Sequence, residues 1–420
     1  AHLVLLTRAD PALPLARLRA RGQVTEIRAR DLRFTPDEAR QFFDLSTNLS
    51  LAETAVRVLD ERTEGWAAGL QLVALALQNQ PDARRQRFID TFRGSHRYVL
   101  DYLAEEVIHQ LGDEIRAFLT QTSVLDRFNA SACQALTGRV DTQTIIAHLE
   151  QLNLFIVPLD GERIWYRYHH LFSDYLRTRL DPAEQAALNK KAAAWHEAND
   201  LPEEAVRYAL ASEDADFAAG VIDRVLEKDK TWSGGNVALL SAWLDALPPT
   251  VFQNRPQLSL NAAQILYLSG RFDLAEERLA QAEQALQAAT ATPGAEQMRA
   301  LATLYRGSIA AVRGHPGAPQ AIEQSSEAQT RLPPENHLAH ARAFFSLGLA
   351  YELSRQTGLA VQNYVRSSDE AALAGVHFLA IHALCAAAQV QISQGQLRLA
   401  EQSCRQAIEL AGGVRLAPLG

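Results

Sequence analysis

The apolar positions at the start of the chain predict a strand. Residues 3–6 form a continuous apolar run that ends on Thr7 and Arg8. Such a run is typical of a strand buried on both faces of a parallel sheet, and the polar residues after it would lie at the edge where open α/β sheets bind ligands. Because one strand cannot make a sheet and the chain opens on Ala1, we expect most of that sheet to precede this sequence. Val24–Ile27 is predicted as a second short strand.

The residues that follow show the 3.6-residue apolar period of helices. Thr35, Pro36 and Glu38 together are typical of a helix start, because threonine can cap the helix, proline suits its first turn and glutamate closes a capping box. Trp66 lies between Gly65 and Gly69 and is predicted to anchor a core in which the glycines permit close packing. Further helical segments are predicted at residues 13–21 (a short helix or a loop), 51–61, 65–77 and within 85–122.

Between residues 113 and 180 the pattern changes to helices followed by one hairpin. Residues 154–159 are predicted as a strand, Asp160-Gly161 as a tight turn, and residues 163–168 as the partner strand. A helix is expected directly afterwards, from His169 to Leu180. Helices followed by a single hairpin are the pattern of a winged helix. Within this region we predict helix caps at Asn129 and Asp141 and a helix stop at Gly138.

From Pro182 onward the sequence shows only alanine-rich helices joined by short turns. Similar turns recur along this part of the chain and place alanines at a period of roughly 40 residues. Helix pairs with this period are the mark of an α-solenoid that resembles a tetratricopeptide repeat, and small alanines let the paired helices approach each other. We expect the solenoid to continue beyond Gly420. The recurring alanines are Ala275, Ala321, Ala360 and Ala400.

Composition restricts the class of protein. The 420 residues are too many for one compact core, so two to four domains are expected. The net charge of −8, with acids and bases interspersed, lacks the basic footprint of a nucleic-acid-binding protein. Three widely spaced cysteines give neither a disulfide framework nor a zinc site, and a reducing cytoplasm is the simplest location. No apolar stretch reaches the roughly 20 residues of a membrane-spanning helix.

Few residues qualify as site residues on pattern alone. Arg8 at a strand end offers a fork of donors to a nucleotide phosphate, or is simply an edge arginine in water. His169 and His170 bind phosphate or metal, or are structural, since adjacent histidines at a helix start do not face the same way. His337 and His340 have the spacing of a helical metal pair but lack a third ligand, so we predict no metal site. We also find no phosphate-binding loop and no nucleophile motif, and therefore predict no catalytic residue.

Four segments together resemble the MalT-like regulators, which are large ATP-binding members of the LuxR class within the signal-transduction ATPases with numerous domains. That family has a nucleotide-binding domain, a helical lid, a winged helix, a solenoid sensor and a carboxyl-terminal DNA-binding helix-turn-helix. The resemblance implies that Arg8 contacts the nucleotide's phosphates and that His169 holds the β-phosphate of ADP. Gln71 stands where the wider class has a proline in the lid motif. The four segments are residues 3–19, 31–35, 63–70 and 166–172.

The resemblance covers essentially the whole chain and implies a mainly α fold. Its parts are the remnant of an α/β nucleotide-binding domain, a helical lid, a winged helix and a tetratricopeptide-like α-solenoid that is cut short. The phosphate-binding loop is expected before Ala1 and the helix-turn-helix after Gly420. The corresponding residues are 1–34, 35–112, 113–180 and 181–420.

The first functional hypothesis is that the chain is a piece of an ATP-dependent, ligand-responsive transcriptional regulator. Its repeat domain would sense a small-molecule or protein inducer, and the nucleotide state would gate self-association and DNA binding by the missing domain, with no membrane contact. ATP or ADP would bind the full-length protein but not this piece tightly, and the piece alone is predicted not to be an enzyme. The alternatives are a helical-repeat scaffold for a partner protein without nucleotide control, and an ATPase whose output is hydrolysis itself.

Overall fold

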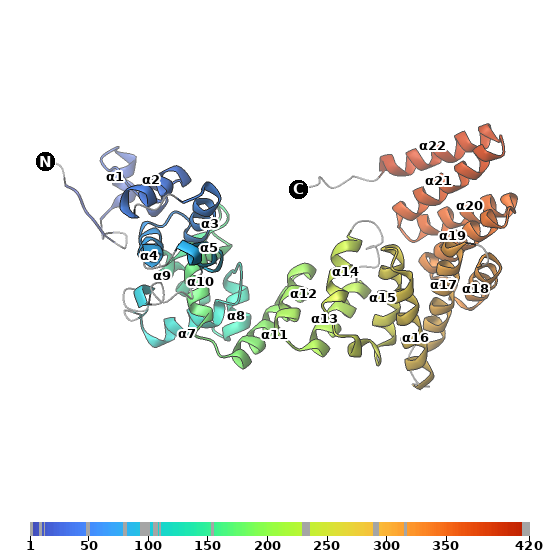
Figure 1. Cartoon of the computed structure of the whole chain (residues 1–420), viewed down its shortest axis with the longest axis horizontal. Helices are drawn as coiled ribbons and strands as arrows, with labels where there is room; N and C mark the ends of the chain where they lie inside the picture. The colour runs from blue at the N-terminus through green and yellow to red at the C-terminus, as the bar shows by residue number, and fades with distance from the viewer. Residues whose placement is uncertain are drawn as a thin grey trace. The chain divides into compact units, whose positions relative to one another are not determined.

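The chain folds into two compact units, Ala1–Ser212 and Glu213–Gly420. The computed structural model describes helices and one two-stranded sheet (Figure 1), so the predicted mainly α fold is confirmed. The description covers residues 3–7, 11, 13–47, 51–78, 82–92, 101–103, 108, 111–152, 155–228, 236–288, 294–314 and 317–413.

The two predicted amino-terminal strands are wrong. Residues 3–7 and 24–27 have no assigned secondary structure and pair with no strand among the described residues, and Leu3 and Leu6 are 81% and 96% exposed. Because no described strand lies beside it, the apolar run has no sheet surface to cover it and stays in solvent. Arg8 lies outside the described residues. The short helix predicted at 13–21 is present as α1 (Leu15–Ala20).

Four helices follow in the segment predicted to be a lid. The predicted capping box is present, because the Thr35 backbone N–H donates to the Glu38 carboxylate at 2.9 Å and the Glu38 N–H donates to Thr35 Oγ1 at 3.3 Å. Phe43, Leu59 and Leu70 are fully buried and form the centre of this part. Within the predicted helical segment 85–122, most of residues 93–110 lie outside the described residues. A short 3-10 helix, η1 (Ala29–Leu32), precedes the four helices, which are α2 (Pro36–Thr47), α3 (Glu53–Thr63), α4 (Ala67–Gln78) and α5 (Asp82–Thr91).

Helices and a hairpin then form the predicted winged helix. Asn129 caps a helix by accepting from the Ala132 N–H at 2.8 Å, and Gly138 ends that helix with φ 73°. Asp141 stands at the predicted cap position of α9, but its carboxylate makes no capping hydrogen bond and accepts from the Arg139 guanidinium instead, at 2.9 and 2.8 Å. The elements are α7 (Asp113–Thr122), α8 (Ala130–Thr137), α9 (Thr142–Gln151), β1 (Ile156–Pro158), β2 (Tyr166–Tyr168) and α10 (His170–Arg177).

The hairpin is antiparallel and pairs Ile156 with Tyr168. Its turn is held by Asp160, whose carboxylate accepts from the N–H groups of Ile164 and Trp165 at 2.9 and 2.8 Å. These bonds draw the start of the predicted second strand into the turn, so that strand is shorter than the predicted residues 163–168. Phe128 bridges to Tyr166 on the other edge and ties the wing to the helices.

The next two helices, α11 (Pro182–Ala198) and α12 (Pro202–Ala211), belong to the first unit. Helix α11 packs on α8, where Lys191 Nζ donates to the Leu136 carbonyl at 3.0 Å. The Tyr208 hydroxyl of α12 accepts from the Asp126 N–H at 2.9 Å.

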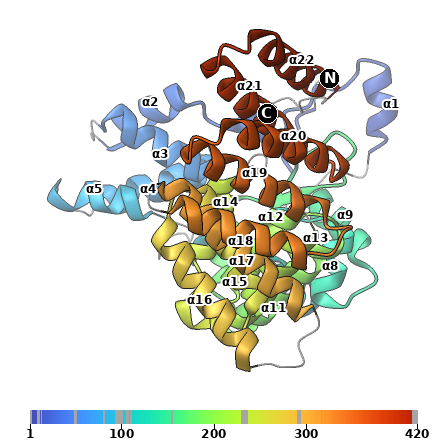
Figure 2. The ribbon, with the colours of Figure 1, turned by 90° about the vertical axis from the view of Figure 1, so that its right-hand side faces the viewer.

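The second unit is a stack of helix pairs (Figure 2). Within each pair the two helices contact each other, and the first helices α15, α17, α19 and α21 also contact one another in succession. The four recurring alanines are buried at the helix contacts, as predicted from their period. No helix in the described part of the chain is long and apolar enough to cross a membrane. The helices are α13 (Ala215–Lys228), α14 (Val237–Asp245), η4 (Pro249–Phe252), α15 (Pro256–Leu268), α16 (Phe272–Ala288), α17 (Ala295–Arg313), α18 (Ala318–Arg331), α19 (His337–Leu353), α20 (Thr357–Leu373), α21 (His377–Ser393) and α22 (Leu397–Gly413).

Candidate functional site

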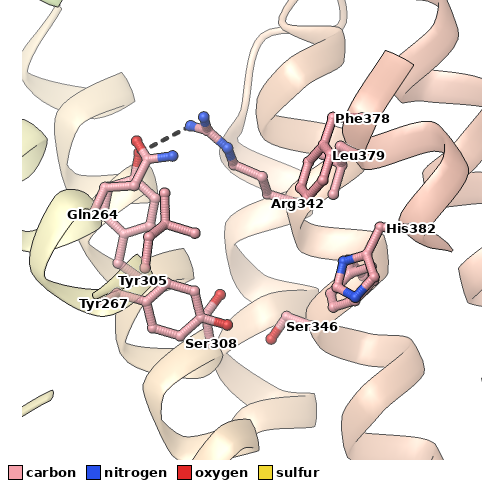
Figure 3. Close-up of a pocket in the computed structure, with 11 residues that line it drawn as sticks. Gln264, Tyr267, Tyr305, Ser308, Arg342, Ser346, Phe378, Leu379 and His382 are labelled. Atoms are coloured by element: carbon pink, nitrogen blue, oxygen red, sulfur yellow. Dashed lines mark hydrogen bonds between the residues drawn. The ribbon is translucent and has the colours of Figure 1, made fainter. Parts of the chain in front are cut away.

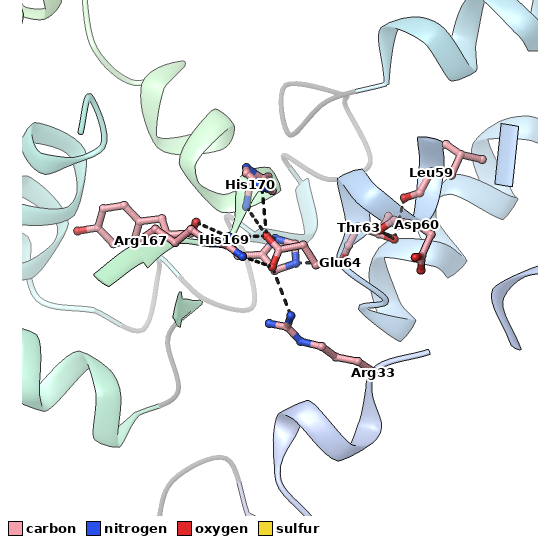
Figure 4. A network of polar contacts seen from close by, with 9 residues as sticks. Arg33, Leu59, Asp60, Thr63, Glu64, Arg167, His169 and His170 are labelled. Carbon is pink, nitrogen blue, oxygen red and sulfur yellow. Dashed lines mark hydrogen bonds and ion pairs between the residues drawn. The ribbon is translucent and has the colours of Figure 1, made fainter. Parts of the chain in front are cut away.

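Three of the four segments that carry the resemblance meet at one point of the first unit (Figure 4). Glu64 follows the last residue of α3 in the left-handed conformation, with φ 51°. Arg167 lies in β2, and His169 is the cap residue of α10. Arg33 reaches the same carboxylate from the segment before α2. We call Arg33, Glu64, Arg167 and His169 the Glu64 cluster.

The Glu64 carboxylate is the centre of this cluster. It accepts from both terminal nitrogens of Arg167, at 2.8 and 2.9 Å, and from the His170 backbone N–H at 3.1 Å. Arg33 Nη1 lies 3.4 Å from the second carboxylate oxygen. Burial alone would raise the pKa of Glu64, but the hydrogen bonds from Arg167 and from the backbone outweigh it and lower the pKa to about 2. Glu64 is therefore an anion at neutral pH.

His169 is buried, with 4% of its surface exposed. Its Nε2 lies 2.9 Å from the Thr63 carbonyl oxygen, which can only accept, so the proton sits on Nε2. Among the described residues Nδ1 has no hydrogen-bond partner, and it lies 4.0 Å from the Glu64 carboxylate. Burial lowers the pKa of His169 to about 4, although the Glu64 charge opposes this shift. The imidazole is therefore neutral at pH 7.

Aromatic side chains enclose the imidazole. Trp66 meets the His169 ring edge-on at a centroid distance of 6.0 Å, and Phe155 does so at 5.8 Å. Trp66 also packs edge-on against Tyr102 at 5.5 Å. A Cβ at Gly69 would lie 2.7 Å from the Trp66 ring, so this glycine permits the close packing that was predicted.

Gly65 joins the segment before α2 to the end of α3. Its carbonyl accepts from the Phe34 N–H at 2.9 Å, and its φ is +67°. A Cβ here would lie 2.3 Å from the Phe34 carbonyl oxygen. Only glycine allows this approach, which brings Arg33 close to Glu64.

This arrangement does not match a bound phosphate. The one N–H of neutral His169 is engaged by a carbonyl, its lone pair lies next to a carboxylate, and the nearest guanidinium is already paired. Phosphate requires free donors or positive charge. The role of His169 in holding a β-phosphate stays a prediction, as does the role of Arg8, which lies outside the described residues.

Metal chemistry is not indicated in the part of the chain that the structure describes, where no group of three histidine, cysteine or acidic side chains is placed to hold an ion. His337 and His340 do not act as a pair, because His337 Nδ1 lies 2.8 Å from the Glu370 carboxylate and His340 Nε2 lies 3.1 Å from the Pro333 carbonyl.

Sequence reasoning placed His169 in the site but missed the charged residues around it. Arg33, Glu64 and Arg167 were each inside a segment quoted for the resemblance, and none was singled out. The sequence did offer a way to find them, because each is a charged residue within a short motif whose apolar residues pack in the core. What pattern alone does not provide is the pairing of two residues 103 positions apart.

Comparisons with known sequences find similarity to the MalT regulators. The family model of the MalT winged helix domain matches residues 104–188. The HTH-type transcriptional regulator MalT of Vibrio cholerae is 28% identical over 402 residues, which cover 95% of this chain and 44% of that protein. The regulator of the same name from Yersinia pestis is 30% identical over 415 residues, which cover 97% of this chain and 45% of that protein. The chain thus spans under half the length of these relatives.

A solved structure shows a similar fold. It is the crystal structure of a signal transduction ATPase with numerous domains from Pyrococcus horikoshii, which carries a tetratricopeptide repeat sensor. The TM-score is 0.51 at 13% identity, and the match covers 90% of this chain and 60% of that one. At this identity the likeness concerns the fold alone. Over nearly its whole length the chain is thus similar to the MalT regulators, and its residues 104–188 match the MalT winged helix domain.

Proposed function

We propose that this chain is part of an ATP-dependent, ligand-responsive transcriptional regulator that acts in the cytoplasm. In this proposal the helical repeat senses an inducer, and the nucleotide state gates self-association and DNA binding by a helix-turn-helix elsewhere in the protein. The relatives named HTH-type transcriptional regulators support the first part of the proposal. The likeness of the fold to an ATPase with a repeat sensor is consistent with the second.

The observation that carries the proposal is the contact between the end of α3 and the winged helix through the Glu64 cluster. A regulator with two states needs a contact that is made in one state and broken in the other. The cluster suits this role because it joins elements distant in the chain through a few directional bonds. If the charged groups move apart before water reaches them, they lose their partners and are not yet solvated. Intermediate separations are therefore unfavourable, which favours two discrete states over a gradual change.

The test is transcription by the full-length protein without inducer. His169→Ala removes the bond to the Thr63 carbonyl, and we expect basal transcription to rise. His148→Ala, at an exposed position of the same winged helix, is the matched control and should leave it unchanged. A basal level that is the same for His169→Ala as for the unmodified protein would refute a regulatory role for this contact.

A nucleotide titration tests the second part of the proposal. The full-length protein should bind adenine nucleotide tightly, whereas the 420-residue chain alone should show no ATP turnover. If the full-length protein binds no adenine nucleotide, nucleotide control is excluded and a helical-repeat scaffold is the better description.

A further inference from the structure

A cavity of about 150 Å³ lies in the second unit on the first helices of four successive pairs. The lining residues come from α15, α17, α19 and α21, and Figure 3 shows Gln264 and Tyr305 facing Arg342 across the cavity. We call the hydrogen-bonded residues Gln264, Tyr305 and Arg342 the polar wall, and the stacked rings of Phe345, Phe378 and His382 the aromatic wall.

The guanidinium of Arg342 is the unusual group in this cavity. Its one hydrogen bond in the described part of the chain goes to the Tyr305 hydroxyl at 3.3 Å, and no described carboxylate lies within ion-pair distance. Burial lowers the pKa of Arg342, because desolvation disfavours its charge. Charged side chains inside a protein are normally paired. Arg306 on the neighbouring helix α17 is paired, with the Glu283 carboxylate at 2.8 Å, although its side chain is 39% exposed.

The polar wall fixes the position of this cation. Tyr305 donates its hydroxyl proton to Gln264 Oε1 at 2.8 Å, so the lone pair of the hydroxyl is left to accept from Arg342. Both Tyr305 and Gln264 are buried. A guanidinium has five N–H donors, and a single contact of 3.3 Å leaves most of them available to a ligand.

The aromatic wall offers a flat apolar surface beside the cation. The His382 ring stacks on Phe345 at a centroid distance of 4.9 Å and on Phe378 at 6.1 Å. Phe378 is 60% exposed at the edge of the cavity, which places a large apolar side chain where a bound molecule would cover it.

We propose that this cavity binds a small organic monocarboxylate with one flat ring. The carboxylate would pair with Arg342, and the ring would lie against the wall formed by Phe345, Phe378 and His382. A guanidinium matches the two oxygens of a carboxylate. A doubly charged phosphate fits less well, because one cation in a mostly apolar cavity leaves its second charge unbalanced. The size agrees, since a cavity of about 150 Å³ accommodates a benzene ring.

The proposal gives a chemical class to the inducer and in that sense rests on the proposed function, but the binding step does not depend on nucleotide control. The probe is phenylacetate, titrated into the 420-residue chain by calorimetry, with neutral phenylacetamide as the matched ligand. Because a hydrogen-bonded charge is lost, we expect phenylacetamide to bind at least about tenfold more weakly.

Variants locate the site. Arg342→Gln should weaken phenylacetate binding at least about tenfold, whereas Arg306→Gln, which removes a paired guanidinium, should leave it within about twofold. Phe378→Ala, at an exposed position, provides a second variant should Arg342→Gln fail to fold, and it should weaken both ligands. Absence of phenylacetate binding, or equal binding by the Arg342→Gln and unmodified chains, would overturn the proposal.

The two proposals fail separately. If phenylacetate binds through Arg342 but no monocarboxylate changes transcription by the full-length protein, the cavity assignment stands and the identification of its ligand as the inducer is wrong. If transcription responds to another inducer while phenylacetate does not bind the chain, the cavity assignment is wrong and the regulator remains.

Discussion

Arg167 and Glu64 form a two-point ion pair in which each terminal nitrogen of the guanidinium meets one carboxylate oxygen, at 2.8 and 2.9 Å. The Glu64 side chain is 8% exposed and that of Arg167 is 24% exposed. Removing one member of such a pair leaves a buried charge without its partner, which costs more than the pair itself contributes. We therefore expect Arg167→Gln to lower the free energy of unfolding by about 2–3 kcal/mol in urea denaturation.

The same hairpin contains the control for this prediction. Arg163 also pairs with a glutamate, Glu150, at 2.9 Å, but its side chain is 66% exposed. Exposed ion pairs contribute about 0–1 kcal/mol, so Arg163→Gln should change stability by less than about 1 kcal/mol. Equal losses for the two variants would show that burial of the Glu64 carboxylate does not determine the cost.

Acid should destabilise the first unit through His169. Its pKa is about 4 in the fold against an ordinary 6.5, so between these values the unfolded chain binds a proton that the folded chain does not. Stability therefore rises with pH across this window and falls on acidification, by up to about 3 kcal/mol for this group. Glu64, with a pKa near 2 against 4.5, adds a loss of the same sign below pH 4.5.

The variant His169→Gln tests this pH dependence of the unfolding free energy. Glutamine retains an N–H donor for the Thr63 carbonyl but does not titrate, so the slope of unfolding free energy against pH between 4 and 6.5 should become smaller. His196, whose pKa is lowered by burial, should maintain a residual slope in both chains. An unchanged slope in the variant would assign the acid sensitivity to other groups.

The backbone contact at Gly65 should tolerate no side chain. Gly65→Ala adds a Cβ 2.3 Å from the Phe34 carbonyl oxygen and places alanine at φ +67°. Gly138→Ala isolates the second cost, because Gly138 has φ +73° and no atom within 4 Å of an added Cβ. In thermal unfolding we expect a loss of about 1 kcal/mol for Gly138→Ala, and at least about 2 kcal/mol more for Gly65→Ala. Similar losses would mean that the Phe34 backbone moves away freely.

Local rules in the sequence predicted most of the fold. The capping box at Thr35, the cap at Asn129 and the stop at Gly138 depend on residues within a few positions of each other, and all three are present. The failures share a different cause. The strand at residues 3–7 depends on a partner strand that the described residues do not provide, and Asp141 had a competing guanidinium nearby.

The candidate site was predictable only in part, for the same reason. His169 could be singled out by its place after the wing, but its neighbours are set by tertiary contacts that periodicity does not specify. Arg342 was not distinguished by its sequence, because the chain contains many helical arginines and this one differs in lining a cavity without a carboxylate partner among the described residues. That property belongs to the packing of four separate helices.

The last prediction concerns the recurring alanines of the repeat. Ala360 is fully buried in a cluster with Tyr364, Ala387 and Val390, where α20 meets α21. A leucine there adds three carbon atoms to a closely packed contact, and overpacking of this kind costs about 1–3 kcal/mol. Ala372 on the same helix is exposed, so Ala372→Leu should change stability by less than about 0.5 kcal/mol.

Because each pair in a solenoid is stabilised by its neighbours, Ala360→Leu should also broaden the urea transition of the second unit as α21 and α22 separate from the rest. Urea unfolding followed by circular dichroism measures both effects, and a midpoint and slope equal to those of Ala372→Leu would show that the repeat does not depend on close helix approach at this alanine.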